Sequence, residues 1–256
     1  MINNQTKAVR RSGEPTTLDR IENNQKTVEQ LRSQDSDDAP ALAETINNCR
    51  ARSRCMNGAC QICGAAVQRL FVKSALSLWP RGTKLVHITI IPRLMRRSVG
   101  SLGTIDLSEV KGHLSDLLRA AEHSHLRGIA FIDLCHAIDK RSNSEAWYPH
   151  YHMAAAADDT SDLTENFRAV LPPTREVRRP ILRVQLNDPD RQLHYMSKPR
   201  PSRVTRFDRP GASVHPLKQW LKPREHIEAA LWLGRSSVLE RIIVLPNPRK
   251  AQSGAT

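Results

Sequence analysis

The apolar residues of this chain fall into short runs that predict strands and amphipathic helices. Three runs rich in β-branched and aromatic residues predict strands at 84–91, 128–135 and 147–155. Between the first two, residues 106–123 predict a helix, because apolar residues recur there at helical spacing, at Leu107, Val110, Leu114, Leu117 and Leu118. A short polar stretch separates the last two strands and predicts a hairpin. The order indicates an α+β fold with an antiparallel sheet flanked by helices.

Further elements are predicted on either side of this centre. Asp188 followed by Pro189 is typical of a helix N-cap with proline in the first turn, and Pro199 closes the short helix that opens there. Residues 65–79 and 224–233 each predict a helix, and residues 178–186 predict a strand. Residues 238–245 fit either a helix or a strand.

Composition divides the chain into four parts. The first is rich in Asn, Gln, Ser, Thr and charge, and we expect a polar tail that is disordered or partly helical. A cysteine-rich segment with a helix follows, then the main α+β domain and a basic C-terminal extension. The expected boundaries are 1–45, 46–80, 81–200 and 201–256.

The net charge of +13 is concentrated in the middle of the chain. Residues 45–105 hold ten Lys and Arg but no Asp or Glu. Because positive charges along one segment repel one another, this segment favours a polyanion as binding partner, and nucleic acid is the first candidate. A generally basic protein and an anionic membrane surface remain alternatives, although no basic amphipathic helix supports the membrane. With neither a long apolar run nor an apolar leader, we expect a soluble cytoplasmic protein without a membrane partner.

Four of the five cysteines lie within fifteen residues, in the pattern C-x5-C-x4-C-x2-C. Thiols at this spacing, in a chain without a secretion signal, favour a tetrahedral structural Zn²⁺ over disulfides, and the predicted ligands are Cys49, Cys55, Cys60 and Cys63. A redox dithiol or unbound cysteines are the alternatives. Three arginines lie between the first two cysteines and are candidates for phosphate contact, namely Arg50, Arg52 and Arg54. Cys135 lies in an apolar strand and is interpreted as core.

His150 and His152 are two residues apart on a predicted strand, so both rings project from one face of the sheet. If the hairpin turns near residues 141–142, Asp133 lies directly opposite His150 on the same face. Two imidazoles and a carboxylate fit a catalytic Mg²⁺ or Mn²⁺ that leaves positions open for a phosphate oxygen. His136 is a competing ligand, but it falls on the opposite face. An exposed strand face without a metal is the alternative.

The motif that contains these histidines is Trp-Tyr-Pro-His-Tyr-His at residues 147–152. It resembles the W-x-P-H-x-H motif of HUH replication initiators, in which a bulky hydrophobic residue separates two histidines. The strand 128–133 resembles the segment that supplies the acidic ligand in that family, and 84–91, with Thr89, resembles its first strand. The resemblance covers about residues 84–200. It implies an HUH nuclease-like catalytic domain at 81–200 with the ferredoxin-like fold of these initiators.

The resemblance also implies a tyrosine nucleophile. The chain has three tyrosines, and two of them lie inside the histidine motif. The third, Tyr195, stands in a Y-x-x-K pattern with Lys198, similar to the family's nucleophile motif and, as in its replication-initiator branch, after the histidines. Pro199 stands where many members carry a second aromatic residue, and a single tyrosine excludes a two-tyrosine mechanism. A ring that simply packs on the sheet is the alternative for Tyr195.

These features together predict a single-tyrosine Rep endonuclease that nicks and joins DNA. Its partner would be single-stranded or hairpin DNA at an origin, in rolling-circle replication of a plasmid or phage, or in transposition. Arginines after the tyrosine are candidates for holding that strand, namely Arg200, Arg203 and Arg206. The alternatives are a zinc-containing DNA-binding regulatory protein without nuclease activity, and a metal-dependent hydrolase that forms no covalent intermediate.

Overall fold

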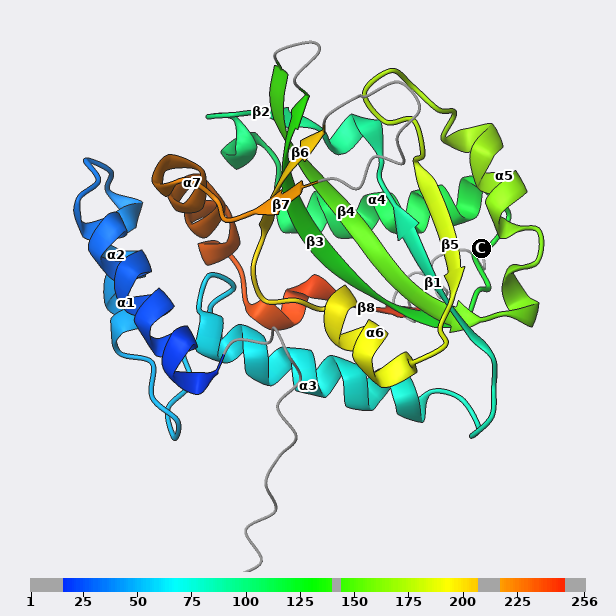
Figure 1. Ribbon diagram of the computed structural model, residues 1–256, viewed down its shortest axis with the longest axis horizontal. Coiled ribbons are helices and arrows are strands. Elements are labelled where there is room, and N and C mark those ends of the chain that lie inside the picture. Colours follow the sequence, from blue (N-terminus) through cyan, green and yellow to red (C-terminus); the bar gives the residue numbers. More distant parts are fainter. Residues whose placement is uncertain (1–15, 140–143, 207–216, 247–256) are drawn as a thin grey trace, which may run out of the picture.

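One mixed sheet runs through the computed structural model, which describes residues 16–139, 144–206 and 217–246 (Figure 1). The strand order is β5-β1-β4-β3-β6-β7, with β2 also paired to β4 and β8 to β3. The strands are β1 (Leu85–Ile90), β2 (Arg97–Ser98), β3 (Gly128–Asp139), β4 (Ser144–Ala156), β5 (Ile181–Gln185), β6 (Ser202–Arg206), β7 (Leu217–Gln219) and β8 (Ile242–Leu245).

The predicted α+β class is confirmed, with one correction to the sheet. Every pairing is antiparallel except that of β3 with β6, which is parallel. A parallel pair needs a crossover connection. The chain makes this crossover after β4, passing through β5 and α6 (Pro189–Met196) before it returns to the other side of β3. Hydrophobic pattern alone does not specify such a return.

The long β3–β4 hairpin is the centre of the sheet and carries the predicted metal ligands. Its register pairs Asp133 with His150, as the predicted turn required. The last described pair is Asp139 with Ser144, and the turn itself lies outside the described residues. Because side chains alternate along a strand, this register fixes which residues share each face.

Different helices cover the two faces of this hairpin. On one face, Phe131 of β3 packs against α3 (Gln61–Ser77) and α6. On the other, the hydroxyl of Tyr151 donates to the carbonyl of Val110 in α4 (Leu107–Ala120). Figure 1 shows α3 and α6 beneath and in front of the strands, with α4 behind them. The predicted helix at 106–123 is confirmed as α4, and Asp106 caps its first turn together with Glu109.

The N-terminal segment corrects the expected polar tail. Residues within 1–45 form α1 (Thr17–Arg32) and most of α2 (Asp38–Asn47), which pack against each other and the rest of the protein. Sequence pattern missed this packing because two of the inward positions of α1 are polar, Asn24 and Thr27. Residues 1–15 lie outside the described part of the chain.

The C-terminal segment is also part of the main fold. Strands β6, β7 and β8 belong to the central sheet, and α7 (Pro223–Gly234) lies beside α1 and α2 (Figure 1). The largest core cluster extends from Val28 to Leu245. The expected boundaries at residues 45, 80 and 200 therefore do not separate independent units. Residues 238–245 form a 3₁₀ turn followed by β8.

Two smaller points complete the fold. Helix α5 (Leu163–Val170) lies beside β5 at the other edge of the sheet (Figure 1). None of the helices that the structure describes has an apolar stretch long enough to cross a bilayer.

Candidate functional site

Asp133, His150 and His152 form a buried cluster on the sheet face that α3 and α6 cover. Nε2 of each histidine lies 3.4 Å from Oδ2 of Asp133. These separations are longer than a hydrogen bond and match those of ligand atoms sharing one ion at about 2.1 Å. The three side chains could therefore hold a metal ion. The predicted convergence of these residues is present in the structure.

Hydrogen bonds at the other ring nitrogen point each imidazole toward Asp133. Nδ1 of His150 lies 2.9 Å from the carbonyl oxygen of Tyr148. Because a carbonyl only accepts, Nδ1 carries a proton, and this bond turns Nε2 toward Asp133. Nδ1 of His152 lies 2.9 Å from Nε2 of His87 and 3.2 Å from the hydroxyl of Thr89, both on β1. Nε2 of His152 is buried, with no hydrogen-bond partner among the described residues, as suits a metal ligand.

The charge states of the cluster also suit a cation. Burial lowers the pKa of His152 to about 3, so its ring is neutral at pH 7. Burial alone would raise the pKa of Asp133, but Lys198, followed by His150 and His152, outweighs it and holds that pKa well below its usual value. The site at neutral pH therefore presents one carboxylate and a neutral imidazole lone pair.

Lys198 enters this cluster directly. Its Nζ lies 2.8 Å from Oδ2 of Asp133 and 3.2 Å from the hydroxyl of Ser202. Burial alone would lower the pKa of Lys198, but the Asp133 carboxylate outweighs burial and raises it, so the lysine is charged at neutral pH. The sequence predicted Lys198 on one helical face with Tyr195. Instead, α6 ends at Met196, and Lys198 lies two residues beyond its end.

Tyr195 lies at the open side of the cluster. Its ring centroid is 6.0 Å from that of His152, and the ammonium of Lys198 is 5.6 Å from the same tyrosine ring. The side chain is 46% exposed. It is therefore reachable from solvent and does not pack into the core, unlike Tyr151 on the opposite face of the sheet. Asp188 caps α6, with Pro189 in the first turn, as predicted.

Two residues at the site were not predicted from the sequence. His87 orients His152, and its only sequence signal is its alternation with Thr89 on β1. Arg241 is buried and donates to the carbonyls of Ile132, Pro199 and Lys198, while its guanidinium stacks on Phe131 at 4.4 Å. It lies 3.8 Å from Asp133. Arg241 therefore joins residues 198–199 to β3, and both partners lie far from it in the sequence.

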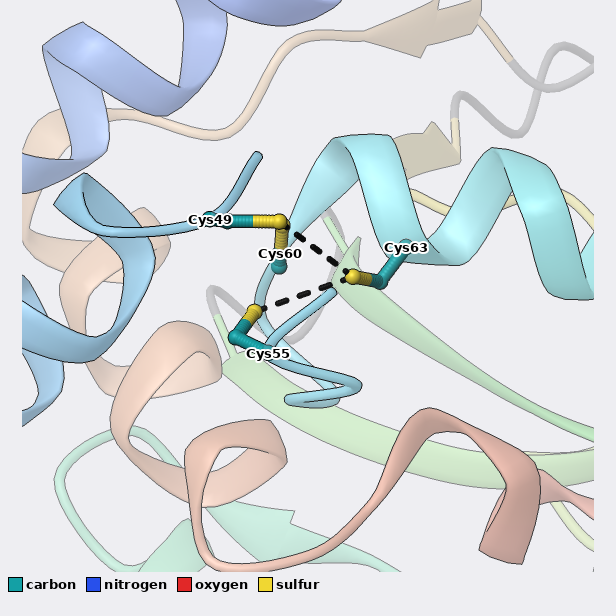
Figure 2. Close-up of side chains that lie close together, drawn as sticks. All are labelled: Cys49, Cys55, Cys60 and Cys63. Atoms are coloured by element: carbon teal, nitrogen blue, oxygen red, sulfur yellow. Dashed lines mark hydrogen bonds between the residues drawn. The ribbon is translucent and has the colours of Figure 1, made fainter. Parts of the chain in front are cut away.

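The four predicted cysteine ligands also converge (Figure 2). Sγ of Cys63 lies 3.5 Å from that of Cys49 and 3.7 Å from that of Cys55, close to the spacing around a tetrahedral ion bound by four thiolates at about 2.3 Å. All are free thiols. Hydrogen bonds from Cys55 and Cys63 lower the pKa of Cys60, which favours a thiolate at that sulfur. The four cysteines could hold a metal ion.

The candidate phosphate-binding arginines lie in different settings. Arg50 donates to the carbonyls of Asn47 and Cys49 at the end of α2, and Arg52 is exposed, whereas Arg54 is partly buried. Arg203 is largely buried and pairs with Glu225 at 3.2 Å. Arg206 ends β6. Arg200 stacks on an exposed tryptophan, Trp220, at 4.8 Å.

His136, the competing histidine, lies on the opposite face of β3, as its position predicted. It is fully buried beside Trp147, and its ring nitrogens lie 3.5 Å from Glu225 and 3.6 Å from Glu145. Because the two carboxylates approach different ring nitrogens, the arrangement fits a histidine held between two acids better than a second metal centre. Cys135 is partly buried and lies outside the cysteine cluster.

Comparison with known proteins adds nothing to this geometry. No family model, curated protein or solved structure matches the chain. Function therefore has to be argued from the side chains themselves.

Proposed function

We propose that this protein nicks and joins single-stranded DNA, with Tyr195 as nucleophile and a divalent metal held by Asp133, His150 and His152. The observation that supports this most is the half-exposed Tyr195 ring, 6.0 Å from the ring of His152 at the edge of a buried Asp-His-His cluster. A nucleophile beside a potential metal site is the arrangement that phosphoryl transfer requires. The resemblance to HUH replication initiators supports the same function.

Each residue has a separate part in this reaction. When bound, Mg²⁺ or Mn²⁺ would polarise the scissile phosphate and stabilise its developing charge. The oxygen of Asp133 and Nε2 of both histidines would hold the ion, with His87 and the Tyr148 carbonyl fixing the rings. Lys198 supplies a positive charge near the tyrosine ring. A charge there favours the phenolate, which is scarce at pH 7 because a free phenol has a pKa near 10.

The chemical step exchanges one phosphoester for another. The phenolic oxygen of Tyr195 attacks phosphorus and gives up its proton, and the bond from phosphorus to the 3′ oxygen breaks. The products are a 5′-phosphotyrosine and a 3′-hydroxyl, which takes up a proton. The reverse attack by a 3′-hydroxyl rejoins the strand. Because one ester replaces another, no external energy source is needed. Rolling-circle replication of a plasmid or phage, or transposition, would use this cycle.

The test is a covalent adduct on a denaturing gel. Purified protein is mixed with Mn²⁺ and a pool of single-stranded and hairpin oligonucleotides labelled at the 3′ end, since the adduct retains that end. We expect a labelled protein band that disappears in Tyr195→Phe. Tyr151→Phe, which removes a phenolic oxygen on the opposite face of the sheet, is the matched control and keeps the adduct.

Other outcomes contradict the proposal in different ways. An adduct that persists in Tyr195→Phe rejects this nucleophile. Cleavage without any adduct identifies a metal-dependent hydrolase. Binding of DNA with neither cleavage nor adduct supports a zinc-containing DNA-binding regulatory protein. One observation favours this last alternative, namely that the ammonium of Lys198 already neutralises Asp133 at 2.8 Å.

We also propose Zn²⁺ as the ion of the cysteine cluster. Its four thiols approach one another closely, and borderline-soft Zn²⁺ is the metal that four thiolates most often hold in a structural site. The cluster is joined to α1 through Asn24, whose amide donates to Sγ of Cys60 at 3.3 Å. The ion would fasten the N-terminal helices to α3.

A further inference from the structure

A second surface feature lies next to the Lys198 segment. Trp220 is 72% exposed, the most exposed of the tryptophans in the described residues. The guanidinium of Arg200 covers one face of its ring at 4.8 Å. Nε of Arg200 in turn donates to Oε1 of Gln61 at 2.9 Å, and the Gln61 backbone amide donates to Asn24. The stacked pair is therefore anchored to α1 and α3.

This pair lines a pocket of about 650 Å³ between α1, the residues just before β6 and just after β7, and α7. The pocket lining includes acidic, basic and amide side chains, notably Glu22, Asn23, Lys26 and Gln30 of α1. An anion-binding site would not include carboxylates, and a site for an apolar ligand would not be this polar. An aromatic surface beside mixed donors and acceptors suits a planar, polar ring.

The pocket is also close to the candidate site along the chain. Arg200 and Pro201 line it, and together with Pro199 they separate Lys198 from Ser202, which are joined by a hydrogen bond. Arg200 follows Lys198 by two residues, which extend at most about 7 Å. A DNA strand with a phosphate at Tyr195 therefore brings neighbouring nucleotides to this pocket.

We propose that the pocket binds a nucleobase of the single-stranded substrate, which stacks on Trp220 and turns its edge toward α1. This inference rests on the proposed function, because it assumes that the substrate is single-stranded DNA. The base is one with an exocyclic amino group, because carboxylates accept from such groups. Glu22 is the acceptor, since the other acid of the lining, Asp19, already accepts from the Thr16 amide. Thymine has no amino group and binds more weakly.

Binding of labelled oligo(dC) and oligo(dT) of equal length to the full chain tests the pocket. Fluorescence anisotropy is measured without added Mg²⁺ or Mn²⁺, so that cleavage does not interfere, and without a chelator, so that the cysteine cluster keeps its ion. We expect tighter binding of oligo(dC). Trp220→Ala weakens both by about tenfold, as loss of a base stack does, whereas Trp220→Phe retains most of the affinity. Glu22→Ala removes the acceptor and with it the preference for oligo(dC), and Glu29→Ala, at an exposed acid on the same helix outside the pocket lining, does not.

The results separate this inference from the proposed function. If Trp220→Ala binds both oligonucleotides as the unaltered protein does, or Glu22→Ala keeps the preference, the pocket does not bind a base. The Tyr195 adduct is assayed in the same preparations. An adduct without any effect of the pocket variants rejects the pocket alone, whereas pocket effects without an adduct reject the nuclease alone.

Discussion

At the scale of single residues, Asp133 connects four other groups of the candidate site. Its carboxylate faces His150 and His152, pairs with Lys198, and lies beside Arg241. It is fully buried. When such a buried carboxylate is removed, its positively charged neighbours are left uncompensated.

Asp133→Asn therefore has two expected effects. Calorimetric titration with Mn²⁺ shows loss of binding, because the amide carries no negative charge. Denaturant unfolding shows a loss of about 3–5 kcal/mol, because the Lys198 ammonium loses its buried partner. Asp116→Asn, which breaks a surface pair with Arg119, is the control and costs at most about 1 kcal/mol. Unchanged Mn²⁺ binding in Asp133→Asn would reject the metal site.

A second variant separates the two effects. Lys198→Met in the Asp133→Asn background removes the unpaired ammonium, and stability returns while Mn²⁺ binding does not. If stability stays low, the loss in the single variant comes from something other than the unpaired charge.

At the scale of elements, the cysteine cluster connects the end of α2 to the start of α3. Cys49 follows α2, whereas Cys63 lies in the first turn of α3. If an ion holds the four sulfurs together, its removal would loosen the packing of these two helices, since metal binding and folding are coupled.

Cys63→Ser is expected to lose the zinc. We expect the unaltered protein to contain one zinc ion per chain by mass spectrometry of the metal, and a strong chelator to lower its melting temperature. Cys63→Ser contains none and melts at the lowered temperature without chelator. Cys135→Ser is the matched control, since this thiol lies outside the cluster. A full zinc content in Cys63→Ser would exclude the cluster as the binding site.

The elements also show what the sequence can and cannot predict. The β3–β4 register followed from strand alternation and a short polar turn, and these two facts placed Asp133 opposite His150. The approach of Tyr195 to His152 was expected only from the family resemblance, because it depends on the crossover that carries α6 over the sheet and not on any local pattern. Helix α1 was missed because Asn24 and Thr27 are buried polar residues whose partners, Cys60 and His226, lie far away in the sequence.

At the scale of the whole molecule, the N-terminal helix is held against the C-terminal part of the chain. His226 of α7 lies 2.8 Å from Gln30 and 3.3 Å from Thr27, both on α1. Burial, followed by the charge of Arg200, lowers the pKa of His226 to about 4. An unfolded histidine has a pKa near 6.5, so the unfolded chain takes up this proton first as the pH falls.

Stability is therefore lost between about pH 6.5 and pH 4. His226 alone contributes a loss of about 1–2 kcal/mol between pH 7 and pH 5. The glutamine in His226→Gln cannot titrate and still bonds to Gln30. The free energy of unfolding of this variant, measured with denaturant, therefore falls between pH 7 and pH 5 by that much less than the free energy of the unaltered protein. His125→Gln, at an exposed position, gives the control. An identical slope in His226→Gln would show that its folded pKa is not lowered.

Arg241 has a consequence for biosynthesis. It is the last residue of the candidate site to be translated, and it fastens Lys198 to a strand made more than a hundred residues earlier. A nascent chain whose β3, β4 and α6 have already left the ribosome still lacks the hydrogen bonds of Arg241. The order of synthesis thus delays assembly of the candidate site until the sheet around it has been made.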